Sequence, residues 1–360
     1  MKKAYLVLAD GTVYQGYGFG AEAIALGELV FTTGMVGYLE TLSDPAYAGQ
    51  IVMQTFPLVG NYGAIAADAS GKCALSGYVV RECCEEPSNF RCEETLDAFL
   101  KKNGVPGIYG VDTRAVTRHI RDNGAMGAMI CNEIPADLSA LKDYAVAGAV
   151  AGAVAAVSCK EKAVFPAEGA RKYSAAILDY GMRRYLISEL QKRGCEVTVY
   201  PANTAAEEIL AARHDGLLLS GGPGDPAENT ACIAEIRELL GKLPVFGVGL
   251  GHQMAAIAAG AKTMKMKHGH RGANQPVREV GGRRSFVTSQ NHGYEVIPTS
   301  LKQGEICFIN LNDGGCEGIF YPAWNALTVQ FDPDSHSCSK DTSFLFDRFI
   351  EMMGGEHACR

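Results

Sequence analysis

The sequence predicts an α/β protein of two domains, and three observations support this. Its 360 residues are 47% hydrophobic and 20% charged, as in globular chains long enough to bury two cores. Strand-like and helix-like segments alternate regularly after residue 172. Before residue 155, short strand-like runs and helical stretches follow one another without that alternation. We therefore expect an N-terminal α+β domain followed by a doubly wound α/β domain.

The second half carries the clearer pattern. Its strand-like segments are separated by helical ones, which indicates parallel strands joined by right-handed crossovers. The segments in order are SAAILDY (174–180), RRYLISELQKRG (183–194), EVTVYP (196–201), TAAEEILAARH (204–214) and DGLLLSGG (215–222).

The first half contains shorter strand-like runs bounded by glycine and proline, and two helical stretches. The runs include AYLVLADG (4–11), GELVFTT (27–33), IVMQTF (51–56) and LSGYVV (75–80), and the helical stretches are CEETLDAFLKKNG (92–104) and VDTRAVTRHIRDNG (111–124). Between the halves, CKEKAVFPAEGARK (159–172) mixes charge, proline and glycine and keeps no period. We predict domains at 1–155 and 172–360, with a linker at 156–171.

Charge and cysteine content exclude several classes of protein. A net charge of -7 and a pI near 5.7 argue against nucleic acid or an anionic membrane as the main partner. The twelve cysteines are scattered without a CxxC pair, which indicates reduced thiols. The apolar run in the first residues, MKKAYLVLADG, is too short for the hydrophobic core of a signal peptide, and the apolar segment at 144–158 is too short for a membrane span. We expect a cytoplasmic protein without cofactor or metal.

Four turns at strand ends mark the candidate site, because parallel strands end at one edge of a doubly wound sheet. They are LLLSGGPGDP (217–226), FGVGLGHQ (246–253), VTSQNHGYEV (287–296) and ALTVQFDPDSH (326–336). We expect the third segment to hold a polar binding loop or a plain β-turn.

The second of these turns has the outline of a nucleophile elbow, in which a strand breaks sharply into a helix and exposes one side chain near backbone N–H groups. The apex residue is Gly249, which has no side chain to expose.

These turns, in this order, resemble the class I glutamine amidotransferases, in which the elbow holds a cysteine and the last strand ends in His-Pro-Glu. The segments GELVFTTGMVGYLETLSDPAYAGQIV (27–52), SNFRCEETLDAFLKKNGVPGIYGVDTRAVTRHIRDNGAM (88–126) and KHGHRGANQPV (267–277) also resemble the small subunit of carbamoyl phosphate synthetase. The resemblance implies glutamine hydrolysis and transfer of ammonia to a large subunit that makes carbamoyl phosphate for arginine and pyrimidine synthesis.

The chain departs from that pattern at each catalytic position. Gly249 stands where the family has its cysteine nucleophile, Asp332 where it has histidine, and Asp334 where it has glutamate. Ala46 replaces a serine that helps to hold glutamine. A carboxylate with a reference pKa of about 4 is a poor base for a thiol, and no cysteine lies in the elbow. We therefore expect no intact catalytic residue.

Other positions match those that the family uses to bind glutamine. They are Gly222, Gly224, Leu250, Gln253, Asn291, Gly293 and Tyr294. Gly221 replaces the asparagine that usually precedes the GPGDP segment, so the sequence leaves open whether glutamine still binds, and any such binding is expected to be weak.

Three functional hypotheses follow. The first is a non-catalytic small subunit that supports an ammonia-using large subunit. The second is a pseudoenzyme subunit that senses glutamine or another small ligand. The third is an active hydrolase with relocated residues, for which His252, His292 and His336 are the candidate bases.

Overall fold

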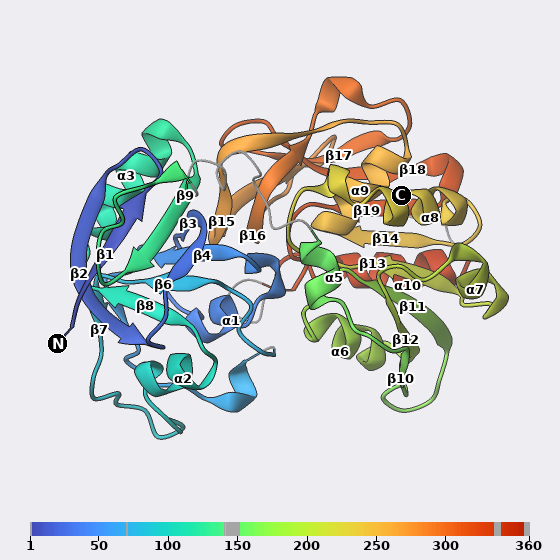
Figure 1. The fold of residues 1–360 in the computed structure, drawn as a ribbon. Coiled ribbons are helices and arrows are strands. Elements are labelled where there is room, and N and C mark those ends of the chain that lie inside the picture. The colour runs from blue at the N-terminus through green and yellow to red at the C-terminus, as the bar shows by residue number, and fades with distance from the viewer. Residues whose placement is uncertain (1, 70, 140, 142–151, 335–339, 356–360) are drawn as a thin grey trace. The chain divides into compact units, whose positions relative to one another are not determined.

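The structure is a computed structural model that describes residues 2–69, 71–139, 141, 152–334 and 340–355 (Figure 1). The chain forms two compact units, Met1–Ala153 and Val154–Arg360. Within the described ranges, no helix combines the length and the apolar character needed to cross a bilayer. The apolar segment predicted at 144–158 falls largely outside these ranges, and its described end forms α5 (Ala153–Val157).

Unit 1 is an α+β domain built around a closed barrel of strand order β1-β2-β8-β6-β4-β3-β9 (Figure 1). Strands β3, β4, β6 and β8 pair in parallel, whereas β1, β2 and β9 join them through antiparallel pairs. The elements are β1 (Lys3–Leu8), β2 (Val13–Gly20), β3 (Ala25–Thr32), α1 (Tyr38–Leu42), η1 (Pro45–Tyr47), β4 (Gln50–Gln54), β5 (Leu58–Val59), η2 (Ala66–Asp68), β6 (Gly77–Val79), β7 (Glu82–Cys83), α2 (Leu96–Lys102), β8 (Pro106–Tyr109), α3 (Thr113–Asn123) and β9 (Met126–Cys131).

Helix α3 follows local sequence rules closely. The Asp112 side chain accepts a hydrogen bond from the Ala115 N–H and caps the helix, and Gly124 ends it with φ 97°. Val116 and Ile120 are buried in the barrel core, one turn apart on the same face. The opposite face remains exposed and is rich in arginine.

Unit 2 is a doubly wound domain, as the sequence predicts, on a ten-stranded sheet of order β10-β12-β11-β13-β14-β19-β18-β17-β15-β16. Strands β12, β11, β13, β14 and β19 are parallel. The elements are β10 (Ala163–Phe165), β11 (Tyr173–Asp179), α6 (Tyr185–Lys192), β12 (Cys195–Pro201), α7 (Ala206–Ala211), β13 (Gly216–Leu219), η3 (Pro226–Glu228), α8 (Thr230–Leu239), β14 (Val245–Val248), α9 (Leu250–Ala258), β15 (Thr263–Glu279), β16 (Ser285–Val296), η4 (Pro298–Ser300), β17 (Glu305–Asn310), β18 (Cys316–Tyr321), η5 (Pro322–Trp324), β19 (Ala326–Val329) and α10 (Phe344–Met353).

Two hydrophobic layers form on the two faces of this sheet. Leu217 and Leu219 of β13 point to one face, where they pack with α7, α8 and α9. Leu218 points to the other face and packs with α6 and α10. The alternation follows from the two-residue period of a strand, and it explains why these strands read as continuous apolar runs.

Two sequence predictions differ from the structure. The segment predicted as a linker without strand character contains β10, which pairs antiparallel with β12. The segment 287–296, predicted as a binding loop or a plain turn, lies within strand β16, which pairs with β15 across two register shifts. Both strands lie toward an edge of the sheet, where pairing with a neighbour compensates for weak intrinsic strand character.

Candidate functional site

The elbow is formed where β14 ends and α9 begins. Gly249 has φ 56° and ψ -112°, a backbone conformation that residues with a side chain rarely adopt. Its N–H donates to the Val329 carbonyl at 2.9 Å, and its carbonyl accepts the Gln253 N–H at 3.2 Å. The turn is therefore held by the neighbouring strand β19 and by the first turn of the helix.

Space for a side chain remains at the apex. A Cβ built on Gly249 meets the Gly221 Cα at 3.5 Å and the Gln330 carbonyl oxygen at 3.9 Å, both ordinary van der Waals contacts. The strand-to-helix turn thus has the strained backbone that the sequence predicts for an elbow, with room for a Cβ at its apex.

The glycine turn after β13 lies beside the elbow, because β13 and β14 are parallel neighbours. Gly251 donates its N–H to the Ser220 carbonyl at 3.0 Å. A Cβ on Gly222 would overlap the Tyr180 carbonyl oxygen, and Gly224 has φ 91°. Packing thus requires a glycine at position 222, and backbone conformation favours one at position 224. Neither reason depends on a ligand at this turn.

Asp332 lies three residues beyond β19, at the same edge of the sheet as Gly249. Its N–H donates to the Ser289 carbonyl at 2.9 Å, which ties it to β16. Its carboxylate accepts hydrogen bonds from the Arg183 guanidinium and the Tyr185 hydroxyl. Only 14% of the Asp332 side chain and 17% of the Arg183 side chain are exposed, so the ion pair is largely shielded from water.

Arg183 and Tyr185 were not predicted from the sequence. They follow β11, whose end is shaped by the Asp179 carboxylate accepting the Gly181 and Met182 N–H groups at 2.9 and 2.8 Å. Because β11 ends at the same sheet edge as β14 and β19, the polar residues after it identify a fifth turn of the site.

Asp334 is buried, with 1% of its surface exposed. The preceding residue, Pro333, anchors this segment through its carbonyl, which accepts the Thr342 hydroxyl at 2.9 Å. His336 lies outside the described residues. Ala46, which is predicted to replace a glutamine-binding serine of the family, lies in η1 of unit 1. Its N–H donates a hydrogen bond to the Asp44 carboxylate.

The predicted glutamine-binding residues of α9 and β16 are joined by Gln253. Its side-chain amide donates to the Tyr294 carbonyl at 2.7 Å and to the Gln330 side-chain oxygen at 2.8 Å. Asn291 and Gly293 flank His292 on the same strand, and Leu250 is buried at the first position of α9. The elbow helix, β16 and the end of β19 therefore form one connected wall.

His252 is fully buried and faces Thr328, whose hydroxyl lies 2.8 Å from its Nδ1. Burial lowers its pKa to about 3. The ring is neutral at physiological pH and packed inside the domain. It has the character of a core histidine, not of a base directed at a substrate.

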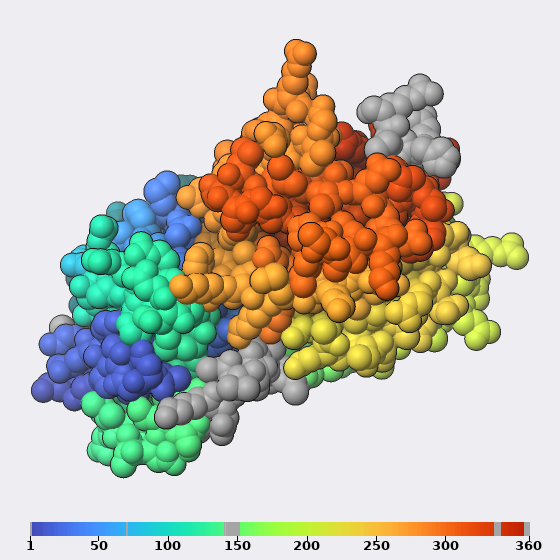
Figure 2. Space-filling model, turned by 90° about the horizontal axis from the view of Figure 1, so that it is seen from above, coloured from blue at the N-terminus to red at the C-terminus, as the bar shows by residue number. Residues whose placement is uncertain are grey.

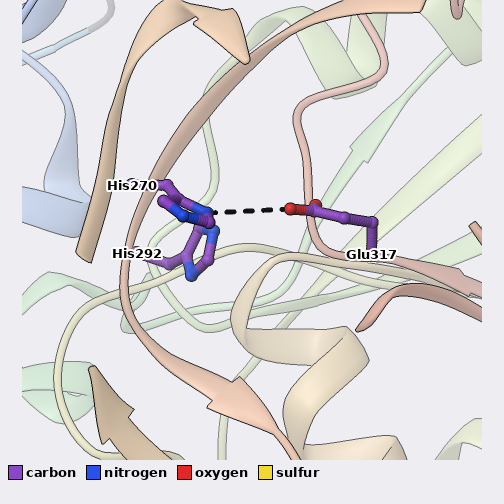
Figure 3. Close-up of side chains that lie close together, drawn as sticks. All are labelled: His270, His292 and Glu317. Atoms are coloured by element: carbon purple, nitrogen blue, oxygen red, sulfur yellow. Dashed lines mark ion pairs between the residues drawn. The ribbon is translucent and has the colours of Figure 1, made fainter. Parts of the chain in front are cut away.

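His270, His292 and Glu317 form a buried cluster beside this wall (Figure 3), and a donor atom from each lies within 4.8 Å of the others. The ring nitrogens of His292 face the Tyr294 carbonyl at 2.8 Å and the Gln290 side-chain oxygen at 3.0 Å. A metal ligand needs a nitrogen lone pair directed at the ion, whereas both nitrogens of this ring face oxygen atoms of the same strand. The arrangement fits a hydrogen-bonded structural cluster better than a metal centre.

The cluster is held by an ion pair. The Nδ1 of His270 lies 3.7 Å from Glu317 and its Nε2 lies 2.9 Å from Asp313. Burial alone would lower the pKa of His270, but these carboxylates raise it above its ordinary value. Burial and the neighbouring His270 lower the pKa of His292. One histidine is thus stabilised as a cation and the other as a neutral ring.

Two buried thiols of the described residues are poor candidates for a substitute nucleophile. Cys232 and Cys316 are free and buried, and burial raises the pKa of Cys316 to about 12. Burial also raises the pKa of Cys232, so neither residue supplies a thiolate at neutral pH.

Comparison with known proteins identifies the two units. Residues 6–130 match the family described as carbamoyl-phosphate synthase small chain, CPSase domain, and residues 176–352 match glutamine amidotransferase class I. The carbamoyl phosphate synthase small chain of Bacillus thuringiensis subsp. konkukian is 43% identical to this chain, and the match covers 99% of both chains. The chain belongs to the carbamoyl phosphate synthase small chain family.

A second curated relative agrees with that assignment. The carbamoyl phosphate synthase small chain of Fusobacterium nucleatum subsp. nucleatum is 45% identical over 98% of both chains. Among solved structures, a glutamine amidotransferase of Thermotoga maritima is 16% identical, with a TM-score of 0.37, covering 52% of this chain and 86% of that one. The amidotransferase match places a class I glutamine amidotransferase domain in the second unit.

Proposed function

We propose that this small chain does not hydrolyse glutamine and that it supports a carbamoyl phosphate synthase large subunit that takes free ammonia. The observation that carries the proposal is the state of Asp332, whose carboxylate is bound by Arg183 and Tyr185 where the family has its histidine base. Glutamine hydrolysis requires a nucleophile that attacks the amide carbon and a base that takes the nucleophile's proton. Gly249 supplies no nucleophile, and a carboxylate neutralised by a guanidinium is a weak base.

Relocated catalytic residues are poorly supported. His252 contacts Thr328 inside the domain, and both ring nitrogens of His292 face oxygen atoms. The buried thiol of Cys316, with a pKa of about 12, carries almost no thiolate at neutral pH. An active hydrolase would require several of these groups to leave their present partners.

Reconstitution with the large subunit of the same organism tests the proposal. Carbamoyl phosphate synthesis is measured with glutamine or with ammonium as the only nitrogen source, and ammonia release from glutamine is measured in parallel. We expect synthesis with ammonium and none above background with glutamine. A family member with cysteine at the elbow serves as the positive control. Glutamine-dependent turnover that survives removal of contaminating glutaminase would contradict the proposal.

A second role, as a glutamine-sensing subunit, is favoured by one observation. Gln253 joins Tyr294 and Gln330 through hydrogen bonds, and a Cβ at Gly249 would make only ordinary van der Waals contacts. In this case glutamine binds weakly and changes the ammonium-dependent rate without being consumed. Calorimetric titration with glutamine, together with that rate, separates the two roles.

A further inference from the structure

Helix α3 of unit 1 exposes a row of arginines. Arg114, Arg118 and Arg121 lie one turn apart on a face opposite to the buried Val116 and Ile120. The segment that contains this helix, coloured teal, reaches the molecular surface in Figure 2. The row is a fixed feature of the fold because the helix is anchored by its apolar face.

The row borders a hollow of about 530 Å³, which we call the arginine hollow. It is lined by Thr33, Thr55, Arg114, Thr117, Arg118 and Arg121. Thr33 and Thr55 directly follow β3 and β4, which are parallel neighbours, so two strand ends form the wall opposite the helix.

The guanidinium groups supply the donors of this hollow. The hydroxyls of Thr55 and Thr117 already donate to the carbonyls of Thr32 and Thr113 at 3.0 and 2.7 Å. No carboxylate of the described residues forms an ion pair with Arg114 or Arg118, and the Nε of Arg121 pairs only with the adjacent Asp122. In a chain of net charge -7, such a cluster of cations attracts an anionic occupant.

The surroundings indicate a protein as that occupant. Met35 and Val36 lie two and three residues beyond Thr33, and 72% and 59% of their surfaces are exposed. Arginine and methionine are enriched in protein interfaces, where apolar contacts exclude water around charged pairs. A small-molecule site would instead enclose most of its ligand, whereas these arginines lie on an exposed helix face.

We propose that the arginine hollow and the adjacent Met35 and Val36 are a docking site for the large subunit, which places carboxylate side chains against Arg114 and Arg118. This inference rests on the proposed function, because it takes the large subunit as the partner. Carboxylates fit the paired donors of a guanidinium, and partial enclosure strengthens such pairs.

The test compares two double charge reversals in the full chain. Arg114→Glu with Arg118→Glu changes the hollow, and Arg283→Glu with Arg284→Glu changes an exposed turn of unit 2 by the same charge. Binding to the large subunit is measured by calorimetry at 50 and 300 mM salt. We expect the first variant to raise Kd by at least tenfold at low salt and by less at high salt, and the second to stay within twofold of the unchanged chain. Both should keep the same Tm.

Each other outcome overturns the inference in a distinct way. If the unchanged chain binds the large subunit and the Arg114/Arg118 variant binds equally well, the docking site is wrong and the proposed function stands. If the unchanged chain does not bind the large subunit, both fail. Titration with inorganic phosphate adds a third arm. If phosphate binds the unchanged chain but not the variant, and does not compete with the large subunit, the hollow is a small-anion site.

Discussion

Rebuilding the catalytic triad tests the interpretation of the site most directly. We expect the single substitution Gly249→Cys to release no ammonia from glutamine, because Asp332 presents a carboxylate where the family has an imidazole to take the thiol proton. The family triad further requires Asp332→His and Asp334→Glu, since triad members act as a unit. The structure adds Arg183, whose guanidinium would lower the pKa of the imidazole of an Asp332→His variant and weaken it as a base.

The stability cost at Gly249 follows from its backbone. A side chain has room, with no atom nearer than 3.5 Å to a Cβ, so the cost comes from φ 56° and ψ -112° and not from overlap. A strained conformation of this kind costs about 1–3 kcal/mol. In a domain of the size of unit 2, each kcal/mol shifts Tm by roughly 2–4 °C, so we expect Gly249→Ala and Gly249→Cys to lower Tm by roughly 2–12 °C.

Two assays check these expectations. Denaturant unfolding and calorimetry compare Gly249→Ala with the control Gly221→Ala. Gly221 is a neighbouring glycine without positive φ, and a Cβ built on it has nothing within 4 Å. The control substitution should therefore leave the free energy of unfolding unchanged or raise it slightly. Ammonia release compares the single variant, the triple variant and the triple variant with Arg183→Gln. We expect activity to be highest in the last. If Gly249→Ala is as stable as Gly221→Ala, the elbow is not strained, and if Gly249→Cys alone is active, another residue acts as the base.

Further predictions concern pH and packing. Because the pKa of His252 is about 3 in the folded chain and about 6.5 when unfolded, the unfolded state binds more protons below pH 6.5, and the free energy of unfolding should fall as pH drops from 6.5 towards 3. His252→Asn should flatten this dependence in denaturant titrations, and an unchanged slope would contradict the argument. His270 has the opposite sign: its pKa is raised when folded, so its stabilisation is present below pH 6.5 and lost as pH rises through the folded value, and His270→Gln should abolish that loss. Phe346→Ala should cost about 3–5 kcal/mol, because this fully buried ring packs edge-on against Phe246 at 5.7 Å, and a cost below 1 kcal/mol in chemical unfolding would show that the contact contributes little.

The doubly wound domain and its elbow could be predicted from local sequence alone. Apolar runs of four to seven residues alternate with amphipathic segments, and each such run has few alternatives to a buried parallel strand. The glycine at position 249 is visible because the strand breaks there directly into an apolar helix. The family resemblance, which the comparisons confirm, depends on the same local motifs.

Strand β16 could not be predicted in this way. Its residues Gln290, Asn291, His292 and Gly293 have low strand propensity, and they read as a polar loop. They are extended because β15 pairs with them, as His270 opposite His292 and Arg271 opposite Asn291. The partner strand lies about twenty residues earlier, and a local pattern does not specify register across bulges.

The sequence by itself supplied the prediction that Gly249, Asp332 and Asp334 replace the catalytic side chains of the family, because that prediction requires only the identity of the residues at matched motif positions. Only the tertiary structure decided what occupies the site instead. Arg183 and Asp332 are 149 residues apart, and their ion pair exists because β11 and β19 end at one edge of the same sheet. The arginine hollow arises likewise, where α3 packs beside the ends of β3 and β4. The spacing of arginines along the sequence predicts that they share one face of a helix. The groups opposite that face depend on how segments that are distant in the sequence pack together.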